Sequence, residues 1–170
     1  MELIEKILSE ENLQKAIRKV KKNKGAPGVD KMTVQEVEEW FNQYKEELIS
    51  KILNKQYKPM PVKRVYIPKP NGKQRPLGIP TVVDRVIQQA MLQVLSEIYE
   101  PIFSDHSYGF RPNRSAHMAM EEVLGYLNDG YEWIVDLDIE KFFDTVNHDK
   151  LISILRERVN AVSYTHLRAH

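Results

Sequence analysis

Residues 133–148 read WIVDLDIEKFFDTVNH, an apolar segment that carries regularly spaced acids and two adjacent aromatic rings. If residues 135–140 form a strand, their apolar side chains lie on one face, and Asp136, Asp138 and Glu140 lie on the other. A solvated edge strand would explain this alternation equally well. The two phenylalanine rings at 142–143 favour another interpretation, because a solvated loop has little reason to display them. A carboxylate at a strand end beside an apolar wall suits Mg²⁺, which prefers oxygen ligands.

The same stretch resembles the first carboxylate motif of reverse transcriptases, in particular the group II intron-encoded reverse transcriptase/maturase family. In that motif an Asp is followed by Ile, two variable residues and Phe-Phe-Asp, which is similar to DIEKFFD at residues 138–144. The resemblance implies that Asp138 is the catalytic metal ligand and that the backbone carbonyl of Ile139 also binds Mg²⁺. It further implies that the ring of Phe143 faces the sugar of the incoming nucleotide and excludes a ribose 2′-hydroxyl group.

The composition indicates an ordinary globular protein. The chain has 170 residues, of which 42% are hydrophobic and 29% charged, and this length fits one domain. Cysteine is absent, so disulfides and thiolate metal sites are excluded, and the five histidines do not have zinc-site spacing. The chain carries no secretory signal pattern and no apolar run of membrane-spanning length. We therefore expect a cytoplasmic protein with no membrane partner.

The formal net charge of +1 hides a separation of charges along the chain. Two windows, residues 12–29 and 48–83, contain basic residues and no acid. Their basic residues are Lys15, Arg18, Lys19, Lys21, Lys22, Lys24, Lys51, Lys55, Lys58, Lys63, Arg64, Lys69, Lys73 and Arg75. Residues 120–144 are acidic, with Lys141 as their single basic residue. A basic surface for a polyanion and a separate acidic pocket are what a nucleic-acid polymerase requires, although each basic window could also be a solvated face.

Residues 1–23 are predicted to form one helix or two short ones, with Ser9 able to cap the second. Residues 24–30, KGAPGVD, contain two glycines and a proline, which end the helix. One interpretation is a simple helix-terminating loop. The family carries a very similar GxPGxD segment in an extension that closes over the template, so the resemblance implies nucleic-acid contacts here. The residues assigned to these contacts are Lys24, Gly25, Pro27 and Gly28.

A β-hairpin is predicted from residues 62–68 and 73–79, where the side-chain period is two and an Asn-Gly pair suits the turn. Its sequence, IPKPNGKQRPLGIP, resembles that of the fingers hairpin of the same family. The resemblance implies that Lys69 and Arg75 contact the triphosphate of the incoming nucleotide. The remaining cations of the hairpin, interpreted as template or solvent contacts, are Lys63, Arg64 and Lys73.

Further helices are predicted around these segments. Thr33 with Glu36 forms a capping box before an apolar stripe, and Thr81 caps a helix with a broad apolar face. Asp84 lies on the first turn of that helix, and we interpret it as ordinary complementation of the helix dipole. A last helix follows the aromatic pair. Its expected buried positions are Leu151, Ile154 and Leu155.

Residues 107–115, SYGFRPNRS, combine an irregular backbone with aromatic and basic side chains, directly before a helix that Ser115 caps. Aromatic rings offer surfaces for base stacking, and arginines offer phosphate contacts. A charged loop that packs its aromatic rings inward is the other interpretation. The family has a nearly identical segment lying along template and primer, so the resemblance implies nucleic-acid contacts from Tyr108, Arg111 and Arg114.

The predicted fold is α+β, with helix-rich reverse-transcriptase fingers, a β-hairpin and the start of a palm around a central acidic strand. The predicted boundaries are an N-terminal extension at residues 1–32, fingers at 33–130 and the start of the palm at 131–161. The resemblance implies a fragment of an RNA-directed DNA polymerase with an intron maturase role and Mg²⁺ as cofactor. The implied partners are an RNA template, intron RNA, a DNA primer and deoxynucleoside triphosphates.

The second carboxylate motif of the family, a Tyr-x-Asp-Asp hairpin, does not occur in this sequence. Two-metal phosphoryl transfer needs carboxylates that bridge both ions, so Asp138 alone is not expected to support it. We therefore expect this fragment to be inactive by itself. One alternative is a non-catalytic RNA-binding module that assists intron folding. Another is a related nucleic-acid polymerase that is not encoded by an intron. Only the similarity to the sequence motifs of the intron-encoded family argues against it.

Residues 162–170, VSYTHLRAH, differ from the rest of the chain in having neither a helical stripe nor a turn signal. They resemble a different kind of sequence, because a stretch of transposon-derived sequencing adapter translates to these residues. We therefore expect the native reading frame to end near Asn160 and residues 162–170 to be a non-native tail.

Overall fold

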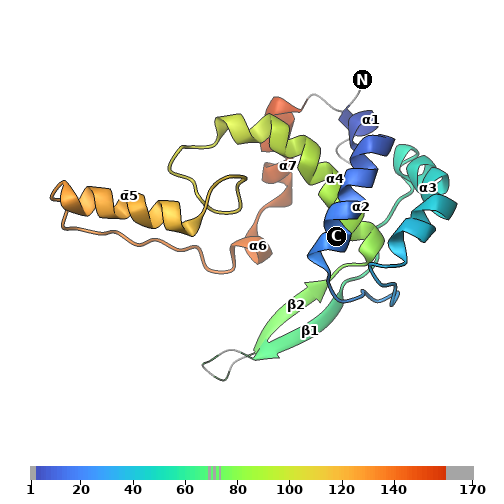
Figure 1. Ribbon diagram of the computed structural model, residues 1–170, viewed down its shortest axis with the longest axis horizontal. Helices are drawn as coiled ribbons and strands as arrows, with labels where there is room; N and C mark the ends of the chain where they lie inside the picture. Colours follow the sequence, from blue (N-terminus) through green and yellow to red (C-terminus); the bar gives the residue numbers. More distant parts are fainter. Residues whose placement is uncertain (1–2, 69, 71, 73, 160–170) are drawn as a thin grey trace. The chain divides into compact units, whose positions relative to one another are not determined.

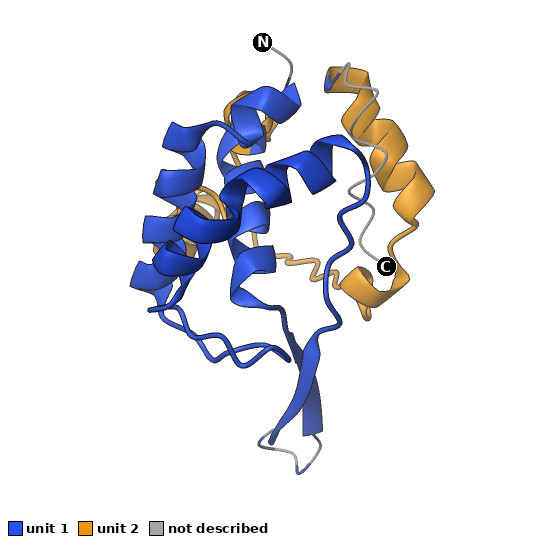
Figure 2. Ribbon diagram, turned by 90° about the vertical axis from the view of Figure 1, so that its right-hand side faces the viewer, with its two compact units in different colours: residues 1–95, 159–170 blue, residues 96–158 orange. Residues whose placement is uncertain are grey.

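The computed structural model describes residues 3–68, 70, 72 and 74–159 and divides the chain into two compact units (Figure 1, Figure 2). Unit 1 comprises Met1–Leu95 and Val159–His170, and unit 2 comprises Ser96–Arg158. The predicted non-native tail lies outside the described residues, as do Lys69 and Lys73 of the hairpin. The boundaries predicted from the sequence are functional divisions and stay predictions.

The core of unit 1 is built by the helices α1 (Leu3–Ile7), α2 (Glu10–Asn23), α3 (Val37–Leu53) and α4 (Val82–Tyr99) (Figure 1). Apolar residues three and four positions apart give each longer helix one buried stripe. The stripes join in a single cluster whose fully buried members include Ile7, Leu13, Ile17, Phe41, Val82 and Val86. Among the described residues, none of the helices combines the length and the apolar character needed to cross a membrane.

Of two predicted helix starts, the one at Thr81 is confirmed by a hydrogen bond and the one at Thr33 is not. The Thr81 hydroxyl accepts a hydrogen bond from the Asp84 amide at 3.2 Å, which caps α4. The Glu36 carboxylate accepts one from the Thr33 amide at 2.7 Å, which is one half of a capping box. Helix α3 nevertheless begins only at Val37, with Glu36 at its N-cap position and no side-chain capping bond, so Thr33 does not cap it as predicted.

The predicted hairpin forms and projects from the helices of unit 1 (Figure 1). Strand β1 spans Lys63–Pro68, and the antiparallel strand β2 spans Gln74–Ile79. All but Val65 and Ile79 of its described strand residues are exposed. The two strands are therefore held to each other by backbone hydrogen bonds rather than by a covering core.

Unit 2, whose residues are all described, consists of helical segments joined by long connections. They are the 3-10 turn η1 (Glu100–Ile102) and the helices α5 (Ala116–Asn128), α6 (Phe142–Thr145) and α7 (His148–Arg158). Ser115 caps α5 as predicted, since its hydroxyl accepts a hydrogen bond from the Met118 amide at 3.3 Å. None of residues 96–158 is fully buried, so this unit has no core of its own.

The central acidic strand predicted at residues 135–140 does not form in this structure. Residues 131–139 have no regular secondary structure, and the strands found among the described residues pair only with each other. Val135, Leu137 and Ile139 are 81%, 88% and 66% exposed. The physical reason is that a strand needs a neighbour for its backbone hydrogen bonds, which side-chain alternation cannot supply. The α+β class itself is confirmed by the helices and the hairpin.

The buried stripe predicted for the last helix is also wrong in this structure. Leu151 and Ile154 on α7 are 42% and 48% exposed, and Leu155 is half-buried. An apolar stripe is buried only where another element covers it, and the covering element cannot be inferred from the stripe itself.

Candidate catalytic segment and nucleic-acid interface

Asp138 lies on an exposed, irregular segment that leads into the short helix α6. Lys141 precedes α6 with a left-handed backbone (φ 52°), and its carbonyl accepts a hydrogen bond from the Asp144 amide at 2.9 Å. This turn brings the rings of Phe142 and Phe143 edge to face, with 5.5 Å between their centroids. Phe143 is 86% exposed, so its ring is open to a ligand.

The oxygen donors of this segment are of the kind that Mg²⁺ binds, but too few of them come together. Among the described residues, no group of three or more His, Asp or Glu side chains is placed to hold a metal ion. Asp138 offers a carboxylate and Ile139 a backbone carbonyl, which is only part of the octahedral oxygen set that Mg²⁺ requires. A complete metal site therefore needs more ligands than the described residues bring together.

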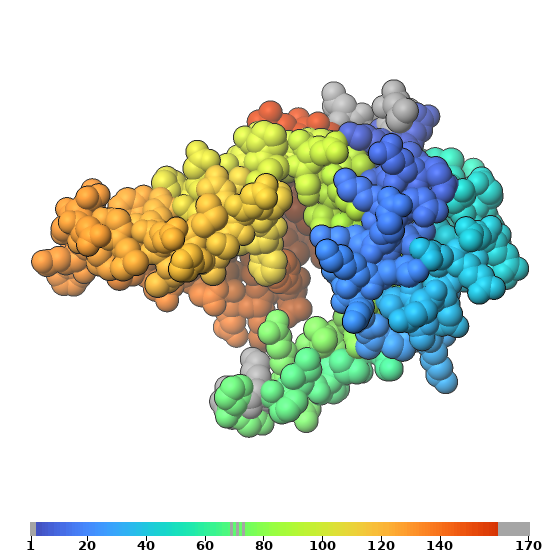
Figure 3. All heavy atoms as spheres, viewed as in Figure 1, coloured from blue at the N-terminus to red at the C-terminus, as the bar shows by residue number. Residues whose placement is uncertain are grey.

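Three cations of the hairpin are exposed, and none has an ion-pair partner within the described part of the chain: Lys63, Arg64 and Arg75. The register places Arg75 opposite Ile67 and Lys63 opposite Ile79, so Arg75 and Lys63 share one face and Arg64 lies on the other. The separation of Arg75 and Lys63 along the strands is roughly 13 Å, at about 3.3 Å per residue. Because the hairpin stands clear of the helices of unit 1 (Figure 3), these cations can meet different parts of a polyanion.

The glycine-rich loop at residues 24–30 packs against the start of α4. A Cβ atom added to Gly28 would lie 2.8 Å from backbone atoms of Thr81, and one added to Gly25 would lie 2.5 Å from the guanidinium of Arg85. Arg85 also donates a hydrogen bond to the Ala26 carbonyl at 2.9 Å. The glycines of this loop therefore have a packing reason of their own.

The residues of this loop predicted to contact nucleic acid differ in exposure. Lys24 and Gly25 are exposed, Pro27 is half-buried and Gly28 is buried. The exposure of Lys24 agrees with a phosphate contact. Gly28 faces the backbone of Pro80 and Thr81, just before α4, so in this structure it lets the loop approach that segment closely, and the contact predicted for it stays a prediction.

The first basic window forms one wall of a groove between α2 and α4. The groove has a volume of about 320 Å³. Its lining residues are Lys15, Arg18, Lys19 and Lys22 from α2, with Gln89 and Gln93 from α4. The four cations recur at helical spacing and so lie on one face of α2. Cations and amides in one groove suit a phosphodiester backbone and its ribose hydroxyl groups.

Asp84 has a larger role than the sequence predicted. It is 4% exposed, and its carboxylate accepts hydrogen bonds from the Thr81 hydroxyl at 2.6 Å, the Met60 amide at 3.2 Å and the Tyr57 hydroxyl. Burial and then the bond to Asp84 raise the pKa of Tyr57 well above its usual range. Asp84 thus ties the segment between α3 and β1 to the start of α4. The sequence carries no signal for this role, because an acid in the first turn is ordinary for any helix.

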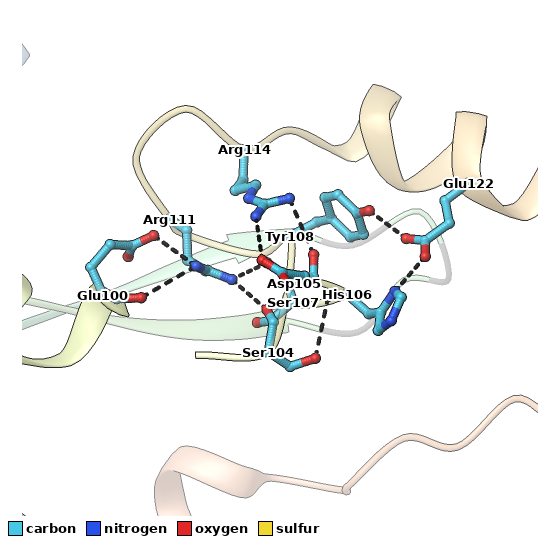
Figure 4. A network of polar contacts seen from close by, with 9 residues as sticks. All are labelled: Glu100, Ser104, Asp105, His106, Ser107, Tyr108, Arg111, Arg114 and Glu122. Carbon is cyan, nitrogen blue, oxygen red and sulfur yellow. Dashed lines mark hydrogen bonds and ion pairs between the residues drawn. The ribbon is translucent and has the colours of Figure 1, made fainter. Parts of the chain in front are cut away.

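Arg111 holds the loop that precedes α5 together from the inside (Figure 4). Its side chain is 8% exposed, and its guanidinium donates hydrogen bonds to the Glu100 carboxylate at 2.9 Å and to the carbonyls of Ser104 and Ser107 at 2.6 and 2.9 Å. These contacts use most of the donors of the guanidinium group. Arg111 therefore stabilises the loop in this structure, and the nucleic-acid contact predicted for it stays a prediction.

Arg114 and Tyr108 belong to the same loop (Figure 4), and the side chain of Arg114 is more exposed than that of Arg111. Arg114 pairs with Asp105 at 3.1 Å and lies 5.5 Å from the ring centroid of Tyr108. The Tyr108 hydroxyl and the His106 ring contact the Glu122 carboxylate. Hydrogen bonds to this carboxylate lower the pKa of Glu122, and the bond from Tyr108 has the largest effect. Asp105 is 92% exposed, so a phosphate group could replace it beside Arg114.

Phe110 is one of the two aromatic residues of the segment 107–115 interpreted as stacking surfaces, although no contact was assigned to it by number. Its backbone is left-handed (φ 57°), and its side chain is fully exposed. This backbone is unfavourable for a bulky residue. The signal that could have singled it out is its position in the irregular segment with Gly109 and Pro112 on either side.

Comparison with known proteins identifies the class to which these segments belong. Residues 67–163 match the family described as reverse transcriptase (RNA-dependent DNA polymerase), a stretch that includes β2, the loop before α5 and the Asp138 segment. Because the match covers more than half of the chain, the chain belongs to the reverse transcriptase family. The resemblance of residues 138–144 to a reverse-transcriptase motif is thus confirmed as far as membership of the reverse transcriptase family.

Relatives of the chain include a protein named as group II intron-encoded and one named as an intron maturase. The chain is 41% identical over 129 residues to the group II intron-encoded protein LtrA of Lactococcus lactis subsp. cremoris, covering 73% of this chain and 21% of that protein. It is 40% identical over 164 residues to protein YkfC of Escherichia coli strain K12, covering 93% of this chain and 43% of that protein. It is 31% identical over 80 residues to the Arabidopsis thaliana protein named nuclear intron maturase 1, mitochondrial, covering 47% and 11%. The chain thus spans less than half the length of each of these relatives.

Proposed function

We propose that this chain supplies the fingers and the first carboxylate segment of an RNA-directed DNA polymerase that acts on intron RNA. The observation that carries the proposal is the reverse transcriptase match across residues 67–163, because that stretch includes both Arg75 and Asp138. Similarity to a group II intron-encoded protein favours intron RNA as the template and as the RNA that a maturase helps to fold.

In the complete polymerase, the primer 3′-hydroxyl oxygen attacks the α-phosphate of an incoming deoxynucleoside triphosphate, and pyrophosphate leaves. Asp138 and the carbonyl of Ile139 contribute oxygen ligands to Mg²⁺. Arg75 and Lys69 contact the triphosphate through charge-assisted hydrogen bonds. The proposed contacts to template and primer come from Lys24, Lys63, Arg64, Tyr108 and Arg114. Primer extension by a chain in which residues 1–159 continue into the later segments of a longer relative tests the proposal.

Replacing Phe143 with alanine in that complete polymerase should raise ribonucleotide incorporation relative to deoxyribonucleotide, on the order of tenfold or more. The reason is that the exposed ring is proposed to fill the space that a 2′-hydroxyl group would need. The measurement is the ratio of kcat/KM for the two kinds of nucleotide. Phe142→Ala is the matched control, because its ring contacts that of Phe143 and is less exposed. An unchanged ratio in Phe143→Ala would leave the ring with a packing role only.

A second candidate is a non-catalytic RNA-binding module that assists intron folding. The groove between α2 and α4 favours it, because its cations and amides need no metal site to bind RNA. Both candidates predict RNA binding by this chain. Only the first predicts primer extension once the later polymerase segments are present.

RNA binding by the chain itself is expected to depend strongly on salt concentration. If the groove cations on α2 neutralise about four phosphates, the logarithm of the association constant falls by roughly 3 for each tenfold rise in salt. Filter binding with a structured intron RNA across a salt series measures this slope. A flat response would mean that the first basic window is only solvated.

The matched variants for this test lie on a single helix. Replacing Lys19 and Lys22 together with glutamine removes two proposed phosphate contacts and should make the slope shallower by about 1.4. Lys21→Gln is the control, because Lys21 is paired with Glu38 at 2.5 Å and does not line the groove. Equal slopes for the double variant and the control would argue against the groove as the binding site.

A further inference from the structure

Unit 1 has a second hollow, which shares no lining residue with the basic groove. It has a volume of about 640 Å³ and is lined by α3, by the segment that links α3 to β1, and by the first turn of α4. Pockets that hold small organic groups commonly measure about 300–1,000 Å³. The hollow is therefore large enough for a nucleobase with its sugar.

The walls of this pocket are aromatic and apolar. Trp40 and Tyr44 lie one turn apart on α3, with 5.4 Å between their ring centroids and a tilt of 40°. Met32 and Met60 line the pocket as well. Tyr44 is 38% exposed and Met60 is 49% exposed, so apolar surface remains uncovered. Exposed rings of this kind hold single-stranded nucleic acids by stacking on the bases.

The polar groups at the bottom of the pocket are already satisfied. Asp84 accepts hydrogen bonds from Tyr57, Met60 and Thr81, as described above. A flat ring can therefore enter the pocket without depriving the buried Asp84 carboxylate of its hydrogen bonds. Gln56, which is exposed at the pocket, offers an amide donor and an acceptor to the edge of a base.

Charged side chains of both signs line the pocket, and its exposed, unpaired cation within the described part of the chain is Lys58. Lys51 also lines the pocket and neutralises Glu47 at 2.6 Å. Asp30 accepts a hydrogen bond from the Met32 amide at 3.2 Å. Both lysines belong to the acid-free window at residues 48–83, which suits a phosphodiester backbone passing the pocket.

We infer that this pocket binds one unpaired nucleotide of the RNA, with its base against Trp40 and Tyr44 and its phosphate at Lys58. The inference rests on the proposed RNA-binding function and adds to it a contact with the base of one nucleotide. Salt-dependent contacts with phosphates do not require such a contact, so the two can be tested separately.

The fluorescence of Trp40 provides a direct readout. The chain has two tryptophans, so the Trp133→Phe variant leaves Trp40 as its single tryptophan. Trp133 is 94% exposed, so its replacement should leave unit 1 intact. The probe is a short single-stranded oligoadenylate, and the comparison is a ribose-phosphate oligomer of the same length that lacks bases. We expect the oligoadenylate to quench Trp40 in a saturable way and the baseless oligomer to bind without quenching.

Substitutions in the pocket give a second readout in filter binding. Tyr44→Ala should weaken oligoadenylate binding on the order of tenfold and leave binding of the baseless oligomer unchanged. Leu53→Ala is the control, because Leu53 is 51% exposed on α3 and does not line the pocket. Lys58→Gln should weaken both oligomers, whereas Lys55→Gln, outside the pocket, should have a smaller effect.

The possible failures are distinguishable. Salt-sensitive RNA binding with no quenching of Trp40 and no effect of Tyr44→Ala would overturn the pocket and leave the proposed function standing. An apolar protein segment as the true occupant would give this same pattern. Equal quenching by the baseless oligomer would also overturn base binding. Absence of any RNA binding in the filter assay would overturn both the pocket and the RNA-binding function.

Discussion

Primer extension by the complete polymerase should be abolished when Asp138 is replaced with alanine. Partners that merely support a metal ligand contribute about 10–100-fold to activity, so loss of the ligand itself should exceed that range. The carboxylate is exposed on the segment before α6, and its removal leaves no packing defect there. The measurement is kcat/KM for deoxynucleotide addition to a primer, in a chain where residues 1–159 continue into the later segments of a longer relative.

Two controls separate a metal ligand from other roles. RNA affinity should be unchanged in Asp138→Ala, because the proposed role of this side chain is to bind a cation and not a phosphate. Asp136→Ala should have a milder effect on extension. The assignment of the motif would be wrong if Asp136→Ala were inactive and Asp138→Ala retained activity.

Replacing Asp84 with alanine is expected to lower the free energy of unfolding of unit 1 by about 3 kcal/mol or more. The carboxylate accepts hydrogen bonds from Thr81, Met60 and Tyr57, and a buried donor left without an acceptor costs about 1–3 kcal/mol. Urea denaturation followed by Trp40 fluorescence in the Trp133→Phe background measures this loss in unit 1. An unchanged midpoint in Asp84→Ala would contradict the network.

Alkaline pH tests the same network from the side of Tyr57. Burial and then the bond to Asp84 raise the pKa of Tyr57 in the folded chain above that of an exposed tyrosine, which is about 10. The stabilisation that the protonated Tyr57 hydroxyl gives the folded chain is therefore complete below pH about 10. It is lost as the pH rises above that value. Tyr57→Phe should reduce the alkaline loss, and Asp84→Asn, which keeps one acceptor oxygen, should destabilise less than Asp84→Ala.

Features made by neighbouring residues could be predicted from the sequence. The caps at Thr81 and Ser115 and the hairpin of β1 and β2 form as predicted, because each depends on side chains and turns a few residues apart. The family could also be predicted, because its motifs are short contiguous stretches of sequence, and the match over residues 67–163 confirms it.

Features made by distant residues could not be predicted in the same way. Arg111 and Arg114 have the same chemistry and were given the same role, yet Arg111 is 8% exposed and Arg114 is 24% exposed. The difference comes from Glu100 and the loop carbonyls, which surround the guanidinium of Arg111. The alternating residues around Asp138 failed as a strand prediction for a related reason, since alternation does not provide a pairing partner.

The sequence by itself determined the family, the caps at Thr81 and Ser115, the hairpin and the two basic windows, since all of these are local in the chain. Tertiary structure alone decided that Asp84 joins two segments and that Gly28 packs against the backbone of Pro80 and Thr81. It also decided that Trp40 and Tyr44 line one pocket with Lys58. The physical reason is that burial and the satisfaction of hydrogen bonds depend on which segments pack together, and residue type alone does not specify that choice.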